Sequence, residues 1–174
     1  MRTSEQQKFL DNIIFSATLA ATVQRASVYR KDAPEPRRQK FRNELKQQLE
    51  KLREQYSTQV SDSTHCENIE TLARDISEKC EDVLADGNFR IGLAQKALNL
   101  YLKFYWCLGV INIPPPHCPI DSIVLKEVPE YNDNPWTKIT QIDEYMNVIK
   151  KVRKKAGKLP LAEWEMQVYN NAQK

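Results

Sequence analysis

The chain has 174 residues and a mass of 20.3 kDa, enough for one domain with a substantial hydrophobic core. Apolar residues make up 41% and charged residues 28%, a balance that argues against a disordered, collagen-like or membrane-embedded protein. Only 4 residues are glycine, and β-hairpin turns commonly need glycine, so we expect an all-α fold rather than an all-β fold. The net charge of +3 is too small to select a class of partner.

The sequence predicts a cytoplasmic protein without a membrane span. The first apolar stretch, residues 13–21, follows Glu5 and Asp11, which is unlike a signal peptide. No run reaches the roughly 18 apolar residues that a membrane helix needs. The four cysteines include no C-x-x-C spacing, and we expect their thiols to be reduced.

Nine prolines divide the chain into long proline-free segments in which helices can form. Apolar side chains recur at helical spacing within residues 4–30, 37–57, 66–85, 93–109 and 140–157, and in a last helix that begins at Pro160. Thr64 and Glu67 resemble a capping box for the third of these helices. Asp121 or Ser122 can cap a short helix that contains residues 123–125.

The segment 93–109 is apolar on almost every side, which is typical of a buried helix. We therefore predict a single all-α domain, residues 1–174, with six or seven helices around this segment. No convincing strand pattern, internal repeat or low-complexity segment is present.

One pair of residues suggests chemistry. Lys96 lies in the first turns of the buried helix, just after Gly92, and Asp121 follows the proline-rich loop 114–119. Backbone N–H groups at a helix start can hold a phosphate, and a shielded lysine can act as an amine nucleophile. We predict a cleft between the 87–92 turn and the 114–122 loop that brings Lys96 and Asp121 together.

Gly92, Lys96 and the segment Pro119-Ile120-Asp121 occur in this order along the chain. In this respect residues 89–125, about a fifth of the chain, resemble the helix-hairpin-helix base-excision DNA glycosylases, and within them the divergent archaeal oxoguanine type. The Leu-Pro-Gly hairpin of that superfamily is absent, and the interval of 25 residues between the lysine and the aspartate is long for it.

The resemblance implies DNA binding and base excision. Lys96 would attack the sugar C1′ to form a Schiff base, and Asp121 would activate the amine or stabilise an oxocarbenium-like state. The base would be flipped from the stack into a pocket. Candidates to line this pocket are Tyr105, Trp106, His117, Tyr131 and Trp136. Candidates to contact the nucleic acid near the helix start are Arg90, Gly92 and Gln95.

A basic run lies near the end of the helix predicted over 140–157. It comprises Lys150, Lys151, Arg153, Lys154 and Lys155. Cations in the last turn of a helix are favoured by its dipole, which is one explanation for the run. The other explanation is a patch that binds phosphates, which would make these five residues part of a DNA-binding surface.

Three other interpretations remain open. Lys96 can be an ordinary polar residue and Asp121 a simple N-cap. The pairs His65-Cys66 and His117-Cys118 contain ligand types that zinc accepts, although their spacing fits no standard site, and we expect no metal and no cofactor. The chain can also be a non-catalytic interaction module, in which the narrow apolar stripe of helix 37–57 packs against a protein partner or a second copy.

Overall fold

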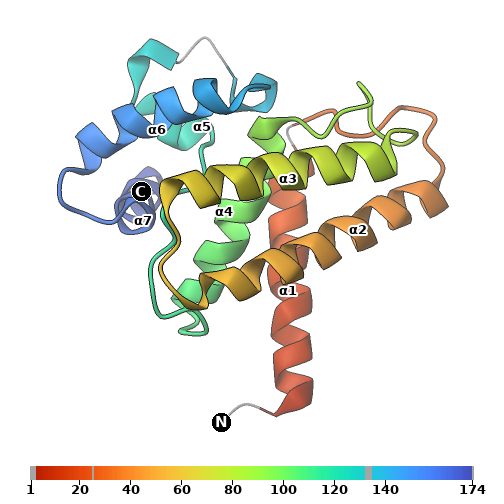
Figure 1. The fold of residues 1–174 in the computed structure, drawn as a ribbon, viewed down its shortest axis with the longest axis horizontal. Coiled ribbons are helices and arrows are strands. Elements are labelled where there is room, and N and C mark those ends of the chain that lie inside the picture. The colour runs from red at the N-terminus through yellow and green to blue at the C-terminus, as the bar shows by residue number, and fades with distance from the viewer. Residues whose placement is uncertain (1–2, 25, 132–134, 174) are drawn as a thin grey trace.

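The computed structural model describes residues 3–24, 26–131 and 135–173, and its described part is all-α, as predicted (Figure 1). These residues form seven α-helices and three short 3-10 helices. The α-helices are α1 (Ser4–Val23), α2 (Glu35–Arg53), α3 (Asp62–Cys80), α4 (Ile91–Cys107), α5 (Ser122–Lys126), α6 (Ile142–Ala156) and α7 (Leu161–Ala172). The 3-10 helices are η1 (Glu54–Ser57), η2 (Pro129–Tyr131) and η3 (Trp136–Lys138). Within the described residues, the nearest approach to a sheet is one isolated bridge between Tyr29 and Leu84.

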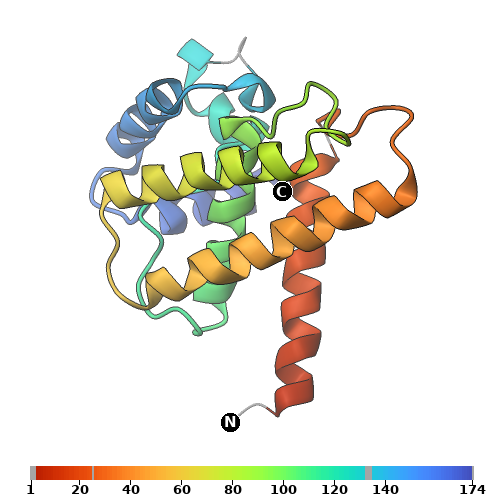
Figure 2. The same cartoon turned by 45° about the vertical axis from the view of Figure 1, so that its right-hand side comes forward.

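Helix α1 crosses the body of the protein, and its N-terminal half extends beyond it (Figures 1 and 2). The side chain of Thr3 accepts a hydrogen bond from the backbone N–H of Gln6, and the side chain of Gln6 accepts one from the backbone N–H of Thr3, which completes a capping box. The helix ends at Val23, earlier than the predicted segment 4–30. None of the described helices is both long enough and apolar enough to cross a bilayer.

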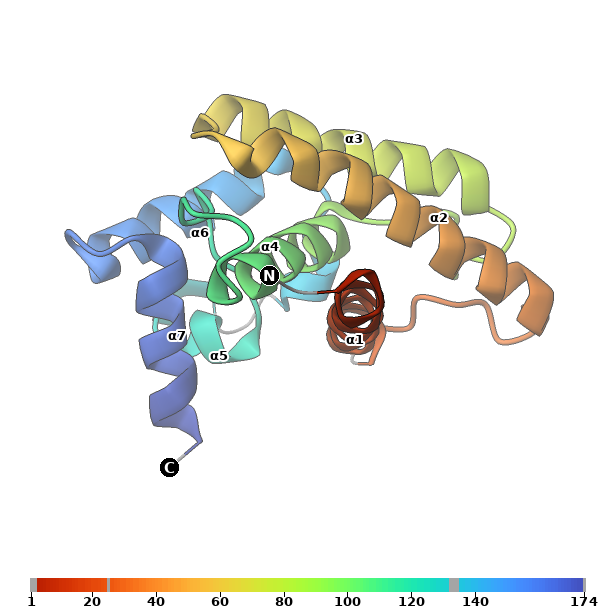
Figure 3. The same ribbon diagram turned by 90° about the horizontal axis from the view of Figure 1, so that it is seen from below.

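Helices α2 and α3 lie side by side as a layer over α4 (Figures 1 and 3). The apolar stripe of α2 is Phe41, Leu45, Leu49 and Leu52, and all four side chains are buried in the core of this chain. The stripe is therefore not exposed for packing against a second copy, which was one of the alternatives left open for helix 37–57. Burial of these side chains provides a large part of the folding free energy of the layer.

Helix α3 begins earlier than predicted. Its N-cap is Ser61, whose hydroxyl accepts a hydrogen bond from the backbone N–H of Thr64. Thr64 is thus inside the first turn, and the expectation that Thr64 caps the helix is wrong. As a result His65 lies on the buried face of α3 rather than in a loop.

Helix α4 is the buried centre of the fold, as its composition predicted. It packs against α1, α2, α3, α6 and η3. Its first turn approaches η3 so closely that a Cβ atom on Gly92 would lie 1.9 Å from the carbonyl oxygen of Trp136. The backbone N–H of Gly92 also donates to the carbonyl of Ile139 at 2.9 Å. Glycine at position 92 therefore allows α4 and η3 to pack, because any other side chain would collide with backbone.

The C-terminal part of the chain covers one flank of α4. After α4 the proline-rich loop leads to α5, which packs against α7, and α6 packs against both α4 and α7 (Figure 3). Gly109 and Gly157 follow α4 and α6 with positive φ angles of 67° and 63°, which is the backbone conformation that ends many helices. This arrangement brings α5 and α7 opposite the face of α4 that carries Lys96.

Candidate functional site

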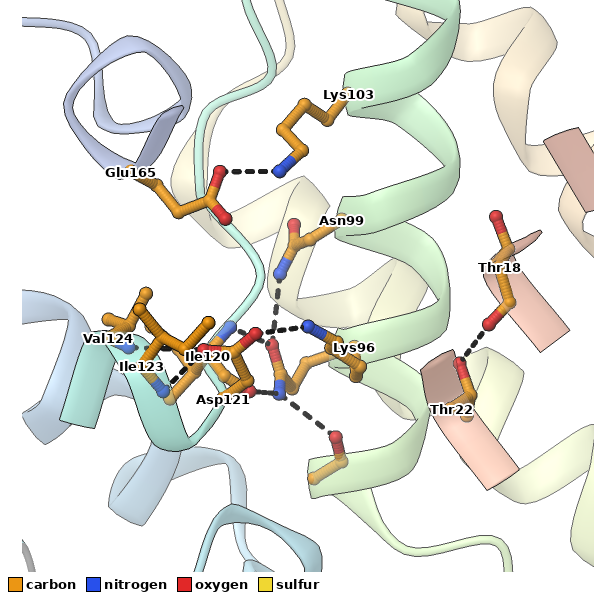
Figure 4. A network of polar contacts seen from close by, with 12 residues as sticks. Thr18, Thr22, Lys96, Asn99, Lys103, Ile120, Asp121, Ile123, Val124 and Glu165 are labelled. Atoms are coloured by element: carbon orange, nitrogen blue, oxygen red, sulfur yellow. Dashed lines mark hydrogen bonds and ion pairs between the residues drawn. The ribbon is translucent and has the colours of Figure 1, made fainter. Parts of the chain in front are cut away.

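Lys96 and Asp121 form a close ion pair. The Nζ atom of Lys96 lies 2.6 Å from Oδ2 of Asp121, and the two side chains are only 7% and 17% exposed. Lys96 extends from α4, and Asp121 lies at the start of α5 (Figure 4). The fold thus brings together the two residues that the sequence analysis selected as a catalytic pair.

Asp121 is at the same time the N-cap of α5. Its Oδ1 atom accepts hydrogen bonds from the backbone N–H groups of Ile123 at 2.9 Å and Val124 at 3.1 Å, which leaves Oδ2 for Lys96. Burial would raise the pKa of Asp121, but the charge and the hydrogen bond of Lys96, together with the two backbone donors, outweigh burial and lower the pKa. The carboxyl group is therefore held in its ionised form.

A second ion pair lies two turns further along α4. The Nζ atom of Lys103 lies 2.6 Å from Oε2 of Glu165 in α7, and these side chains are 11% and 4% exposed. Lys96 and Lys103 extend from the same side of α4 toward their carboxylates (Figure 4). Burial raises the pKa of Glu165, and the neighbouring charge of Lys103 reduces this effect without cancelling it.

Both ion pairs line one cavity of about 320 Å³ between α1, α4, α5, η3 and α7, which we call the Lys96 cavity. The cavity lining includes Ala17, Ala21, Gln24, Leu100, Phe104, Ser122, Ile123, Trp136 and Tyr169 besides the two ion pairs. The Nζ of Lys96 is 6.0 Å from the ring centroid of Trp136, and that of Lys103 is 5.7 Å from the ring centroid of Tyr169. Each lysine is thus shared between a carboxylate and an aromatic ring.

This cavity combines two amines, two carboxylates and aromatic surface in a partly enclosed space. Its volume lies at the lower end of the range of about 300–1,000 Å³ that is usual for small-ligand sites. Of the two aromatic rings beside the lysines, Tyr169 is 45% exposed, whereas Trp136 is buried. The arrangement can hold a planar group against aromatic side chains while an amine and a carboxylate reach it.

The three residues predicted to contact nucleic acid near the start of α4 have other roles. Gly92 and Gln95 are buried, and the Gln95 amide is fully hydrogen-bonded within the chain, so neither is exposed for the DNA contact that was predicted. Arg90 is partly exposed and pairs with Asp86 at 2.7 Å, beside a more open hollow near the end of α3. The tight packing of α4 against η3 and the 114–121 loop explains why Gly92 and Gln95 are enclosed, whereas Arg90 is not.

Of the five predicted pocket residues, Trp136 is among those that line the Lys96 cavity, and the other four are not. Tyr105 is buried and donates a hydrogen bond to Asp11 at 2.5 Å, while Trp106 is partly exposed near the end of α4. Tyr131 ends η2 and is partly exposed. None of these three residues lines the Lys96 cavity. Tyr105 and Trp106 extend from other sides of α4 than Lys96, because residues that follow one another on a helix point in different directions, and Tyr131 belongs to η2, outside the cavity wall.

His117 lies in the core rather than in the pocket. Its Nδ1 atom is 2.9 Å from the hydroxyl of Tyr145, and its Nε2 atom is 3.3 Å from Oδ1 of Asp62. His65 is also buried, 2.7 Å from the hydroxyl of Tyr56 and 2.8 Å from Oδ1 of Asn99. The ring nitrogens of both histidines thus face protein groups, and the described residues include no group of three or more His, Cys, Asp or Glu placed to hold a metal ion.

The basic run lies along the second half of α6, and none of its members lines the Lys96 cavity. Arg153 pairs with Asp62 at 2.7 Å, and Lys151 lies 3.4 Å from Glu130. Lys150, Lys154 and Lys155 are exposed, and among the described residues no carboxylate forms an ion pair with them. These three lysines leave positive charge on a face of the protein away from the cavity wall.

The sequence analysis missed Lys103, Glu165 and Tyr169. A signal for Lys103 is present, because Gln95, Lys96, Asn99 and Lys103 are polar residues spaced by one to four positions in an otherwise apolar helix. No comparable pattern marks Glu165, which lies on a helix more than 40 residues further along the chain. Comparisons of this chain with protein-family models, curated proteins and solved structures found no match.

Proposed function

We propose that the protein binds DNA and excises a base through a Schiff base between Nζ of Lys96 and C1′ of the sugar. The observation that supports this function is the ion pair between Lys96 and Asp121, whose Nζ and Oδ2 atoms are 2.6 Å apart. Both residues, together with Trp136, line the Lys96 cavity. The carboxylate of Asp121 lies beside this amine, where it can either accept a proton from it or stabilise positive charge on the sugar.

In the proposed reaction the Lys96 amine, once deprotonated, attacks C1′ while the bond between C1′ and the base breaks. The base leaves with the bonding electron pair and takes up the first of the two amine protons, which leaves a secondary amine on C1′. The C1′–O4′ bond then breaks as the C1′=N bond forms, and O4′ takes up the second amine proton, which gives the ring-opened imine. The lowered pKa of Asp121 keeps its carboxylate ionised, so this group favours positive charge on the sugar in the transition state. Of the two roles open to Asp121, the lowered pKa supports stabilisation of the oxocarbenium-like state.

The rest of the cavity supplies contacts for a flipped base. Leu100, Phe104 and Trp136 offer apolar and aromatic surface on which a planar ring can stack. Lys103 and Glu165 supply one hydrogen-bond donor group and one acceptor group in the same cavity. A base held there would lie between the two ion pairs, with its sugar toward Lys96.

The first experiment is reductive trapping. Purified protein is incubated with duplex DNA that contains either an abasic site or one of several base lesions, in the presence of borohydride, which converts an imine into a stable amine. We expect a covalent adduct whose modified peptide contains Lys96 and not Lys103. The Lys96→Gln variant should give no adduct, whereas the matched control Lys126→Gln, at an exposed lysine of α5, should behave like the wild type. No adduct from the wild type with any of these DNAs would contradict the proposed function.

The second experiment separates the two tasks of Asp121. Asparagine is also a good N-cap, so Asp121→Asn keeps an oxygen for the N–H groups of Ile123 and Val124 but removes the charge. We expect the trapping rate to fall by about 10²–10⁴-fold, the usual contribution of a positioned acid or base. Because Lys96 loses its charged partner, the variant is also destabilised, so the trapping rate is measured on protein that circular dichroism shows to be folded. A wild-type trapping rate in Asp121→Asn would exclude a chemical role for this carboxylate.

A further inference from the structure

Gln95 connects the two segments that carry the ion pair. Its side chain is fully buried, one position before Lys96 on α4. Its Nε2 atom donates to the carbonyl of Ile120 at 2.8 Å, and its Oε1 atom accepts from the N–H of Ile120 at 3.0 Å. Ile120 is the residue before Asp121, so the amide binds both backbone polar groups next to the aspartate, as a neighbouring strand would.

The remaining hydrogen-bonding capacity of this amide is also used. Nε2 donates a second bond to the carbonyl of Gly92 at 3.0 Å, and Oε1 accepts a second bond from Nδ2 of Asn99 at 3.3 Å. A side-chain amide has two donor hydrogens and two acceptor positions, so all four are occupied. The amide orientation is fixed, because exchanging its nitrogen and oxygen would place like groups against each other at Ile120 and at Asn99.

Asn99 is itself held by residues from two other helices. Its Nδ2 atom donates to the hydroxyl of Tyr145 at 3.0 Å, and its Oδ1 atom lies 2.8 Å from Nε2 of His65. These partners come from α6 and α3. The Gln95 amide thus belongs to a buried network anchored on three helices, and this network ends at the backbone of the loop that presents Asp121.

We propose that Gln95 is a positioning residue that fixes the register between Lys96 on α4 and Asp121 at the end of the proline-rich loop. This inference rests on the proposed function for its kinetic consequence, although its structural basis is independent of it. The two segments are separated by 25 residues, and Gln95 bonds both backbone polar groups of the residue that precedes Asp121. Without this clamp the loop can shift along α4, and small displacements of reacting groups lower rates strongly.

The test uses Gln95→Met, which keeps the length of the side chain and adds no charge. The matched control is Asn68→Leu, which removes another buried amide. Asn68 bonds Gln55 and Tyr56, does not line the Lys96 cavity, and is connected to Gln95 only through Tyr56, His65 and Asn99. We measure the rate of borohydride trapping at saturating abasic DNA and, separately, the dissociation constant for the same DNA. Gln95→Met should lower the trapping rate at least about tenfold with an unchanged dissociation constant. Asn68→Leu should leave both values at the wild-type level.

A trapping rate in Gln95→Met equal to that of the wild type would overturn the inference. If Gln95→Met does not fold, Gln95→Glu is used, because its carboxylate can accept from the N–H of Ile120 but cannot donate to the carbonyl. A fall in rate that is equal in Gln95→Met and Asn68→Leu would also overturn the inference, since it would reflect general destabilisation.

If the wild type forms no adduct, the proposed function fails, and the positioning claim is decided by NMR without DNA. In Gln95→Met the amide hydrogen of Ile120 should exchange at least about tenfold faster, and the pKa of Asp121 should rise as its contact with Lys96 loosens. An Asp121 titration unchanged from the wild type would overturn the positioning role by itself.

Discussion

Lys103 and Glu165 join α4 to α7 through an ion pair with an Nζ to Oε2 distance of 2.6 Å and almost no exposure to solvent. The ion pair between Lys96 and Asp121, seven residues earlier on α4, has the same N to O distance and is also largely buried. In both pairs the lysine also faces an aromatic ring of the Lys96 cavity. Two buried charges on one helix face need two partners from outside the helix, and α5 and α7 supply them.

Lys103→Met should destabilise the protein by roughly 3–5 kcal/mol near pH 8, because it leaves the Glu165 carboxylate buried without a partner. The pKa of Glu165 is already above its ordinary value, so in this variant the folded state binds the proton more tightly than the unfolded state. Stability is then regained as the pH falls below the folded-state pKa of Glu165. Urea unfolding at pH 8 and at pH 5 measures the effect.

The double variant Lys103→Met with Glu165→Leu provides the control for this prediction. It removes both charges, and we expect it to be close to the wild type in stability at both pH values. A Lys103→Met variant whose free energy of unfolding does not depend on pH would show that Glu165 is not the group left unpaired.

Gly92→Ala should destabilise the protein by about 3 kcal/mol, the upper end for an overpacked site. Its Cβ would lie 1.9 Å from the backbone oxygen of Trp136, and backbone cannot move aside as a flexible side chain can. Gly109→Ala is the control, since nothing lies within 4 Å of its Cβ and only the positive φ angle opposes alanine, at about 1–2 kcal/mol. Urea unfolding compares the two variants, and a smaller loss of stability in Gly92→Ala than in Gly109→Ala would contradict the packing at η3.

Stability should decline as the pH falls from about 6.5 to 4 because of His117. Burial lowers the pKa of His117 to about 4, although the nearby Asp62 opposes this effect. The unfolded chain takes up the proton near pH 6.5, whereas the folded protein takes it up only near pH 4. The free energy of unfolding is therefore undiminished by His117 above pH 6.5, and about 3 kcal/mol of it is lost by pH 4.

The variant His117→Gln tests this origin of the pH dependence. Its amide can retain the hydrogen bond with Tyr145 but does not titrate. We expect a flatter profile of unfolding free energy between pH 7 and pH 4 than in the wild type. If both profiles are equally steep, other groups cause the decline.

The exposed lysines of α6 should contribute to DNA affinity by neutralising phosphates. The triple variant Lys150→Gln, Lys154→Gln and Lys155→Gln leaves the paired residues Lys151 and Arg153 intact. If these lysines bind phosphates, the slope of log K against log salt should fall in magnitude by roughly 0.9 for each phosphate that the variant no longer neutralises. Fluorescence anisotropy with duplex DNA at several salt concentrations gives the slope, and an unchanged slope would exclude this face of α6 from the DNA interface.

The local sequence was sufficient to predict most helices and the position of the candidate pair along the chain. Proline positions and apolar spacing located the helices because both act over a few residues. Errors occurred at helix ends: Ser61 caps α3 where Thr64 was expected, because two hydroxyl residues three positions apart can both serve as caps. The apolar composition of α4 also predicted its burial correctly.

Over the residues that the structure describes, the local sequence thus determines seven α-helices, and it determines that the central one is buried. It also places Lys96 in the first turns of α4 and Asp121 at the start of α5. Only the tertiary structure decided that Lys96 meets Asp121 and that Glu165 completes a second pair. It also decided that Gly92 is enclosed by η3 and that Gln95 bonds the backbone of Ile120. The physical reason is that helix formation depends on neighbours within about four residues, whereas these pairings depend on how α4, α5 and α7 pack, which is set by the whole core.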